Sequence, residues 1–142
     1  MNRIIKFRAW DKRNNIIRDV IEIIYHSDNY NVMLSEPTEN APKNWSLRKF
    51  DEVELMQFTG LCDRNGKEIY EGDRCEVITA MGPTIKAVVE FNDGCFDLKF
   101  DEKINIREWP IDRDYLKCHT CNYAVTVIGN IHEATGPEKE VR

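Results

Sequence analysis

The first residues able to do chemistry in this sequence form a short run near the N-terminus, where cations alternate with aromatic rings. Lys6, Phe7, Arg8 and Trp10 stand within the segment IKFRAWDK, and the first eighteen residues hold six cations against one acid, Asp11. A basic, aromatic strand can bind single-stranded nucleic acid through phosphate contacts and base stacking. The same pattern is typical of the solvent-facing side of an edge strand, where positive charge prevents unwanted pairing. These four residues are the candidate binding residues, and both interpretations stay open.

The segment GLCDRNGKE, residues 60–68, has the residue types of a phosphate-binding loop but not its spacing. A Walker loop places four residues between its first Gly and its Gly-Lys pair, and a Ser or Thr follows the Lys. Here five residues separate Gly60 from Gly66, and Glu68 follows Lys67. The carboxylate would repel a phosphate, and the predicted loop joins two strands, so it lacks a helix N-terminus. We interpret these residues as turn residues.

The pair in CHTC, Cys118 and Cys121, has the spacing of zinc ligands, yet a structural zinc needs four ligands and usually two such pairs. The sequence has no second pair, and the motif does not open a helix in a βαβ unit as a redox pair would.

The carboxylates Asp73, Asp93, Asp97 and Asp101 fall into no catalytic pattern, and none of the three histidines is flanked by a motif. We therefore expect no bound metal, no cofactor and no enzymatic activity.

The length and composition are those of one domain that can bury a single core of ordinary size. The 142 residues are 42% hydrophobic and carry a formal net charge of −5, which disfavours bulk attraction to DNA or to an anionic membrane. The longest apolar stretches fall short of a membrane span, and charges near the N-terminus interrupt any signal-peptide pattern. We expect a cytoplasmic protein that does not bind membranes, and its five cysteines are expected to be reduced.

Strand patterns dominate the rest of the chain. Alternation predicts a strand in IIKFRAW with Phe7 and Ala9 on one face and Lys6, Arg8 and Trp10 on the other. The β-branched run IIRDVIEII favours a further strand over a helix. The Asn65-Gly66 pair predicts a turn with positive φ at both residues, and KAVVEF-NDG-CFDLKF predicts a hairpin that turns at Asn92–Gly94. Other strands are predicted in VELMQF, EGDRCEVI and YAVTVIGNI, and the best place for a short helix is Ile104–Lys117.

This pattern predicts a mostly β fold with minor α. Short strands at even spacing with Gly-containing turns are typical of small barrels, and the order of elements after residue 57 suits an SH3-like barrel. The predicted domains are an N-terminal β region over residues 1–57 with a surface loop near 35–45, a barrel over 58–134 and a frayed tail over 135–142.

Three segments together resemble the YopX family of proteins encoded in phages and prophages. They are IKFRAWDK, the central LMQFTGLCDRNGKEIYEGDRCEV and the closing VIGNIHE, which stand in the family's order and span nearly the whole chain. The resemblance implies a mostly β protein of phage origin, and it implies no reaction and no catalytic residues. Cys62 and the pair Arg74-Cys75 depart from the residues expected at those positions.

The function predicted from these observations is a non-enzymatic module that binds a protein or associates with itself. A homo-oligomer is the first expectation, with the segment Ile4–Trp10 as an open sheet edge that pairs between copies. A host or phage protein is a further possible partner. The alternative is a single-stranded nucleic-acid binder that uses Lys6, Phe7, Arg8 and Trp10.

Overall fold

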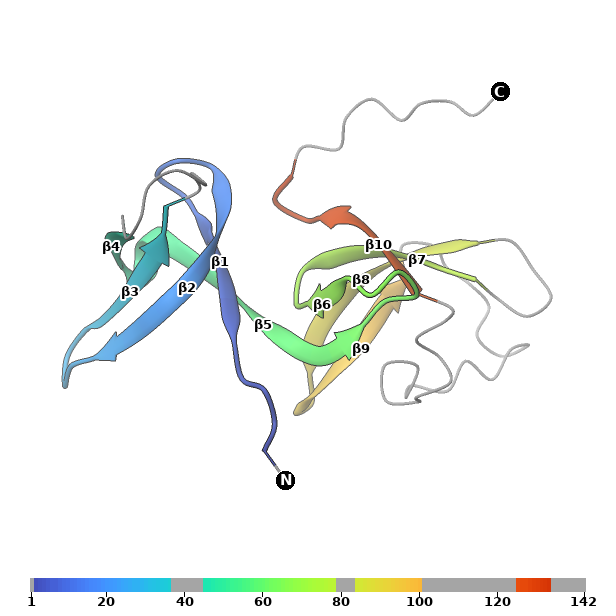
Figure 1. Ribbon diagram of the computed structural model, residues 1–142, viewed down its shortest axis with the longest axis horizontal. Helices are drawn as coiled ribbons and strands as arrows, with labels where there is room; N and C mark the ends of the chain where they lie inside the picture. The colour runs from blue at the N-terminus through green and yellow to red at the C-terminus, as the bar shows by residue number, and fades with distance from the viewer. Residues whose placement is uncertain (1, 37–44, 79–83, 101–124, 134–142) are drawn as a thin grey trace. The chain divides into compact units, whose positions relative to one another are not determined.

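The computed structural model describes residues 2–36, 45–78, 84–100 and 125–133, and within these ranges the chain is mostly β (Figure 1). A single 3₁₀ turn, η1 (Phe50–Glu52), is present in the described part. The strands are β1 (Phe7–Asp11), β2 (Ile16–Tyr25), β3 (Tyr30–Ser35), β4 (Trp45–Lys49), β5 (Val53–Cys62), β6 (Glu68–Tyr70), β7 (Asp73–Val77), β8 (Ile85–Asn92), β9 (Cys95–Phe100) and β10 (Val125–Asn130). The predicted mostly β fold is confirmed.

The strands form two antiparallel sheets that belong to two compact units. One unit contains the residues up to 61 together with 68–71, and the other contains 62–67 together with the residues from 72 onward. The chain therefore enters the second unit at residue 62, returns for β6 and leaves again. The sequence had predicted a single boundary after residue 57.

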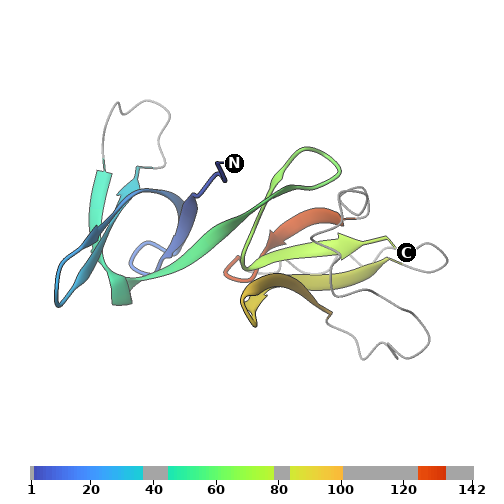
Figure 2. The same ribbon diagram turned by 90° about the horizontal axis from the view of Figure 1, so that it is seen from below.

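The first unit holds a six-stranded sheet in the order β4-β3-β2-β1-β5-β6. A β-bulge between Val20 and Glu22 shifts the register of β2 against β3, and a bulge bends its strand. Figure 2 shows the resulting curl of β1 to β4. Because β1 lies between β2 and β5 in this sheet, both of its edges are paired.

Alternate residues of β1 contribute to two separate apolar clusters. Ala9 packs in a buried cluster with Val32, Leu34 and Val53. Trp10, on the other face, packs against a second buried cluster made by Met56, Phe58 and Tyr70. The predicted alternation along this strand is thus present, and each face contributes to a core.

The prediction that Ile4–Trp10 is an open sheet edge is wrong. β1 pairs with β5 over Phe7–Asp11 and with β2 over Arg8–Asp11, so Arg8 lies opposite both Asp19 and Met56. The pairing with β5 continues beyond the strand, because the Phe58 N–H donates to the Lys6 carbonyl at 2.9 Å. The sequence suggested an edge because a strand at a chain terminus with outward cations resembles one, and nothing local indicates that β5 pairs with it.

The second unit holds a four-stranded sheet in the order β10-β7-β8-β9. One face of this sheet is almost fully buried and carries Cys75, Val77, Ala87, Val89, Leu98, Val125 and Val127. The predicted β8–β9 hairpin is confirmed, and its turn residues Asp93 and Gly94 have φ of 49° and 78°. In the described residues neither sheet closes into a barrel, so the SH3-like barrel stays a prediction.

Several local predictions have clear outcomes. The run IIRDVIEII forms β2 and not a helix. Of the turn pair Asn65-Gly66, only Gly66 has positive φ, at 81°, so the expectation for Asn65 was wrong. Cys75 is buried as expected and Cys95 is half-buried. The predicted helix Ile104–Lys117, the CHTC pair and the tail 135–142 lie outside the described residues.

Candidate binding surface on the first sheet

Two of the four predicted binding residues, Lys6 just before β1 and Arg8 on β1, contact side chains of β5 and β6. Lys6 forms an ion pair with Glu68, and its ammonium lies 4.9 Å from the centre of the Phe58 ring. The Arg8 guanidinium lies 4.4 Å from the centre of the Tyr70 ring. These cation–π and ion-pair contacts hold both cations against their own sheet.

The aromatic members of the predicted site are divided between the two faces. Trp10 packs beside Tyr70 in the cluster already described, while Phe7 lies two residues from Ala9 and so points to the opposite face. The Tyr70 hydroxyl donates to Glu68 at 3.0 Å, and burial, followed by this carboxylate, raises the pKa of Tyr70. The structure therefore brings Lys6, Arg8 and Trp10 together and separates Phe7 from them.

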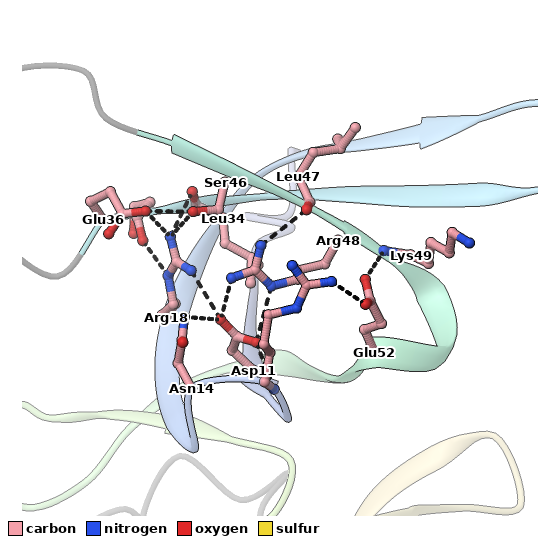
Figure 3. Close-up of polar contacts among 12 residues, drawn as sticks. Asp11, Asn14, Arg18, Leu34, Glu36, Ser46, Leu47, Arg48, Lys49 and Glu52 are labelled. Atoms are coloured by element: carbon pink, nitrogen blue, oxygen red, sulfur yellow. Dashed lines mark hydrogen bonds and ion pairs between the residues drawn. The ribbon is translucent and has the colours of Figure 1, made fainter.

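The opposite face of the sheet contains a buried network of charges centred on Asp11 (Figure 3). The Asp11 side chain is fully buried, and it accepts hydrogen bonds from Arg18 at 3.0 Å and from two nitrogens of Arg48 at 3.2 Å. The Asn14 amide and the Arg13 backbone N–H add bonds of 3.0 and 3.1 Å. Both oxygens of the carboxylate are thus occupied by donors from three parts of the sheet.

Arg18 extends the network to the far edge of the sheet. Its guanidinium donates to the Leu34 and Ser35 carbonyls at 3.3 and 2.6 Å, to the Glu36 carboxylate at 3.0 Å and to the Ser46 hydroxyl at 3.2 Å. Two arginines and two carboxylates balance in charge, which is the condition under which buried ions are tolerated. Because Arg48 and Ser46 belong to β4, the network fixes that strand against β1 and β2.

The carboxylates of this network are held ionised. Burial alone would raise the pKa of Asp11, but hydrogen bonds from Arg48, Arg18 and the Arg13 N–H together outweigh burial and lower it. The Ser46 hydroxyl is the main cause that lowers the pKa of Glu36, and Arg18 adds to it. Because both oxygens of Asp11 accept hydrogen bonds from these donors, the network stabilises the sheet.

The strand that this network fixes, β4, ends the six-stranded sheet in the described chain. Ser46 and Arg48 point into the network, so Trp45 and Leu47 point outward, and they are 54% and 47% exposed. The Lys49 N–H donates to the Glu52 carboxylate at 2.9 Å, which turns it away from β3. Since backbone groups alternate in direction along a strand, the N–H and C=O of Leu47 and Trp45 also point away from β3. We call Trp45–Lys49 the β4 edge.

Sequence reasoning missed the β4 edge. The segment WSLRK alternates apolar and polar residues, which is the signal of a strand, but it follows directly on the polar segment SEPTENAPKN and was in part counted with that loop. The open sheet edge was assigned to Ile4–Trp10 instead. An alternation count over residues 45–49 would have found the strand, although not its place at the edge.

The turn-rich motif of the second unit holds a second buried carboxylate. Asp63 accepts the N–H groups of Asn65 at 2.8 Å and Lys67 at 2.9 Å through one oxygen, and that of Val127 at 3.0 Å through the other. Burial would raise the pKa of Asp63, yet these three backbone donors together lower it. The motif thus closes the turn and ties it to β10, which agrees with its interpretation as a turn and not a phosphate loop.

Two further features were sought in the described residues, a metal-binding cluster and a membrane-spanning helix. No group of three or more His, Cys, Asp or Glu side chains there could hold a metal ion. No helix in the described part of the chain is long and apolar enough to cross a membrane.

Comparison with known proteins gives a family and a fold. The family model described as YopX protein matches residues 6–136. No curated protein sequence matches the chain. Among solved structures, the crystal structure of protein EF1440 from Enterococcus faecalis is similar, with a TM-score of 0.57 and 23% sequence identity over 93% of this chain and 96% of that chain. At this identity the likeness concerns the fold alone.

Proposed function

The chain belongs to the YopX family, and from this premise we propose that it is a non-enzymatic module of phage or prophage origin that associates with a second copy of itself in the bacterial cytoplasm. The observation that carries the proposal is the β4 edge, the last strand of the sheet, where Trp45 and Leu47 expose apolar side chains and the outward Leu47 carbonyl accepts a hydrogen bond of 3.1 Å from the Arg48 guanidinium. An edge strand of this kind is a template for pairing with another strand.

The residues of β4 fit an antiparallel, two-fold symmetric pairing with another β4. With Leu47 on the two-fold axis, Leu47 meets its own copy, Trp45 lies opposite Lys49, and Ser46 lies opposite Arg48. A lysine across from a tryptophan adds a cation–π contact, and no two like charges stand directly opposite each other. The buried network supports this role because it fixes β4 in place, so pairing orders little that is not already ordered.

Light scattering over a range of protein concentrations tests the proposal. We expect a dimer whose population rises with concentration in the micromolar range. Leu47→Asp places two carboxylates against each other on the axis and should raise the dissociation constant at least about tenfold. Ile21→Asp is the matched control, because Ile21 is 57% exposed but lies on β2, away from the edge, and should leave the dimer intact. A wild-type protein that stays monomeric at tens of micromolar would exclude self-association.

Nucleic-acid binding through Lys6, Phe7, Arg8 and Trp10 is the weaker proposal. Lys6 and Arg8 are already held by Glu68 and Tyr70, so phosphate binding would have to break these contacts first. A salt-dependent gel shift of single-stranded DNA or RNA that is abolished by Arg8→Gln would favour it over self-association.

A further inference from the structure

A pocket of about 540 Å³ lies in the first unit between the β2–β3 turn and η1. Its lining residues come from two short segments, Asp28–Asn31 and Lys49–Asp51. Two aromatic rings, two carboxylates, two amides and one ammonium are thus gathered around one cavity. None of these residues takes part in the Asp11 network or has a role in the predicted site.

Both walls of the pocket are held in place by hydrogen bonds. On one side, the backbones of His26 and Asn29 exchange N–H···O bonds of 3.0 and 3.3 Å, which closes the β2–β3 turn tightly. On the other side, the Glu52 carboxylate accepts the Lys49 N–H, and the Lys12 ammonium donates to the Asp51 carbonyl at 3.1 Å. A pocket whose walls are fixed in this way loses little entropy when it binds a ligand.

The aromatic side of the pocket presents polarisable ring surface to solvent. Tyr30 packs against Phe50 with ring centres 5.4 Å apart, and Tyr25 packs edge-on against Tyr30 at 4.7 Å. Tyr30 and Phe50 remain 44% and 48% exposed although they pack together. Exposed ring faces beside carboxylates are the surroundings that protein sites use to bind organic cations.

The charges around the pocket favour the same class of ligand. Asp28 and Asp51 outweigh Lys49, which leaves a net charge of one negative unit among the lining residues. The nearby Lys12 ammonium is 4.0 Å from Glu54, and Arg13 is ion-paired with Glu52, so these two cations have carboxylate partners of their own.

We propose that this pocket binds the cationic side chain of a basic peptide segment, an arginine or a lysine, with the Tyr30 and Phe50 rings against its alkyl chain and charged group and with Asp28 and Asp51 as counter-charges. The Asn29 and Asn31 amides then offer oxygen acceptors to the N–H groups of that side chain. This site goes beyond self-association, because it lies at the turn end of β2 and β3 and binds a cation of a separate peptide, although its Lys49 is also part of the β4 edge.

The experiment is an NMR titration of the ¹⁵N-labelled full chain with N-acetyl-argininamide, with the neutral isostere N-acetyl-citrullinamide as the matched probe. We expect saturable shifts in the amides of Asn29, Asn31 and Phe50 with the arginine probe, and at least about fivefold weaker binding of the citrulline probe. Equal affinity for both probes, or no saturable shift at these amides, overturns the proposal.

Variants locate the site and separate it from self-association. Phe50→Leu and Asp51→Asn should each weaken binding about fivefold, and neither residue belongs to the β4 edge. Phe91→Leu is the control, because Phe91 is an exposed ring in the second unit, packed against Phe96 at 5.1 Å. The titration is repeated with the Leu47→Asp variant, so that loss of the dimer and loss of the pocket are read separately. Equal weakening by Phe91→Leu would mean that the probe does not distinguish this pocket, and the assignment would fall.

Discussion

Asp11 in the first unit and Asp63 in the second are both buried with a lowered pKa, but their charges are satisfied in opposite ways. Asp11 in the first unit depends on two arginine side chains, one on β2 and one on β4. Asp63 in the second unit depends on three backbone N–H groups, two of them within four residues in the sequence. The first arrangement needs the folded sheet to bring its charges together, and the second is largely built by a local turn.

The difference predicts how each site fails. A buried carboxylate held by guanidinium groups leaves uncompensated charge behind when it is removed, and the cost of that charge is large. A carboxylate held by backbone N–H groups leaves neutral donors unsatisfied, and each costs less. Replacing Asp by Asn at both positions makes the comparison, because the shape of the side chain is kept while its charge and one acceptor are lost.

The largest effect is expected from Asp11→Asn. Arg18 retains Glu36 as a partner, but among the described residues Asp11 is the one carboxylate to which Arg48 donates hydrogen bonds, and Glu36 and Glu52 act on its charge only from a greater distance. We expect a loss of about 3–5 kcal/mol in the free energy of unfolding of the first unit. Urea denaturation with amide hydrogen exchange of β1, β2 and β4 measures it, and Asn14→Ala, which removes a neutral donor from the same carboxylate, is the control. A loss below 1 kcal/mol, about the same as Asn14→Ala, would show that the network carries little of the stability.

A smaller effect is expected from Asp63→Asn. The amide oxygen can still accept the N–H groups of Asn65 and Lys67, but its NH₂ group faces the Val127 N–H, so one donor–donor contact is created. We expect a loss of about 1–3 kcal/mol, with the increase in amide exchange concentrated at Val127 and its neighbours in β10. If exchange rises equally in β1 and β2, the two sites are not separable and the contrast drawn here is wrong.

How much could be predicted from the sequence follows the same division. Local features were recoverable: the β8–β9 hairpin from its Asn-Asp-Gly turn, β2 from its β-branched residues and the turn at residues 63–67, although the predicted turn segment 60–68 also took in the end of β5 and the first residue of β6. Features that depend on distant partners were not. The sequence showed Asp11 only as the one acid among the N-terminal cations, because no residue near it in the sequence indicates its contact with Arg48. The partner of β1 was missed for the same reason, since β5 lies more than forty residues away.

A still smaller loss of stability is expected from substitutions in the turn of the β8–β9 hairpin, in the second unit. Gly94 has φ of 78°, and nothing lies within 4 Å of the position that a Cβ would take, so only backbone strain opposes a side chain there. Gly94→Ala should cost about 1 kcal/mol, and Gly94→Asn should cost less because asparagine tolerates this conformation. Thermal unfolding of both variants measures the difference. Equal loss in the two variants would mean that steric crowding and not φ limits this position.

The smallest effect is expected on acidification to about pH 4.5, where the two aspartates should contribute almost nothing to the change in stability. Asp11 and Asp63 both have a pKa lowered in the folded chain from 3.8, so the stability that each contributes is fully present above that value. It is lost only as the pH falls below 3.8 and through the folded pKa, because there the unfolded chain binds a proton that the folded chain still excludes. We therefore expect these two sites to contribute almost no change in the free energy of unfolding between neutral pH and about pH 4.5, followed by a steep loss below.

Asp11→Asn and Asp63→Asn should each flatten that acid loss, so that each variant approaches the wild type in stability as the pH falls. If the difference in free energy of unfolding between wild type and variant stays constant down to pH 3, the carboxylate is not held ionised at that site. Measuring both variants shows whether arginine side chains or backbone N–H groups lower the pKa of the aspartate more.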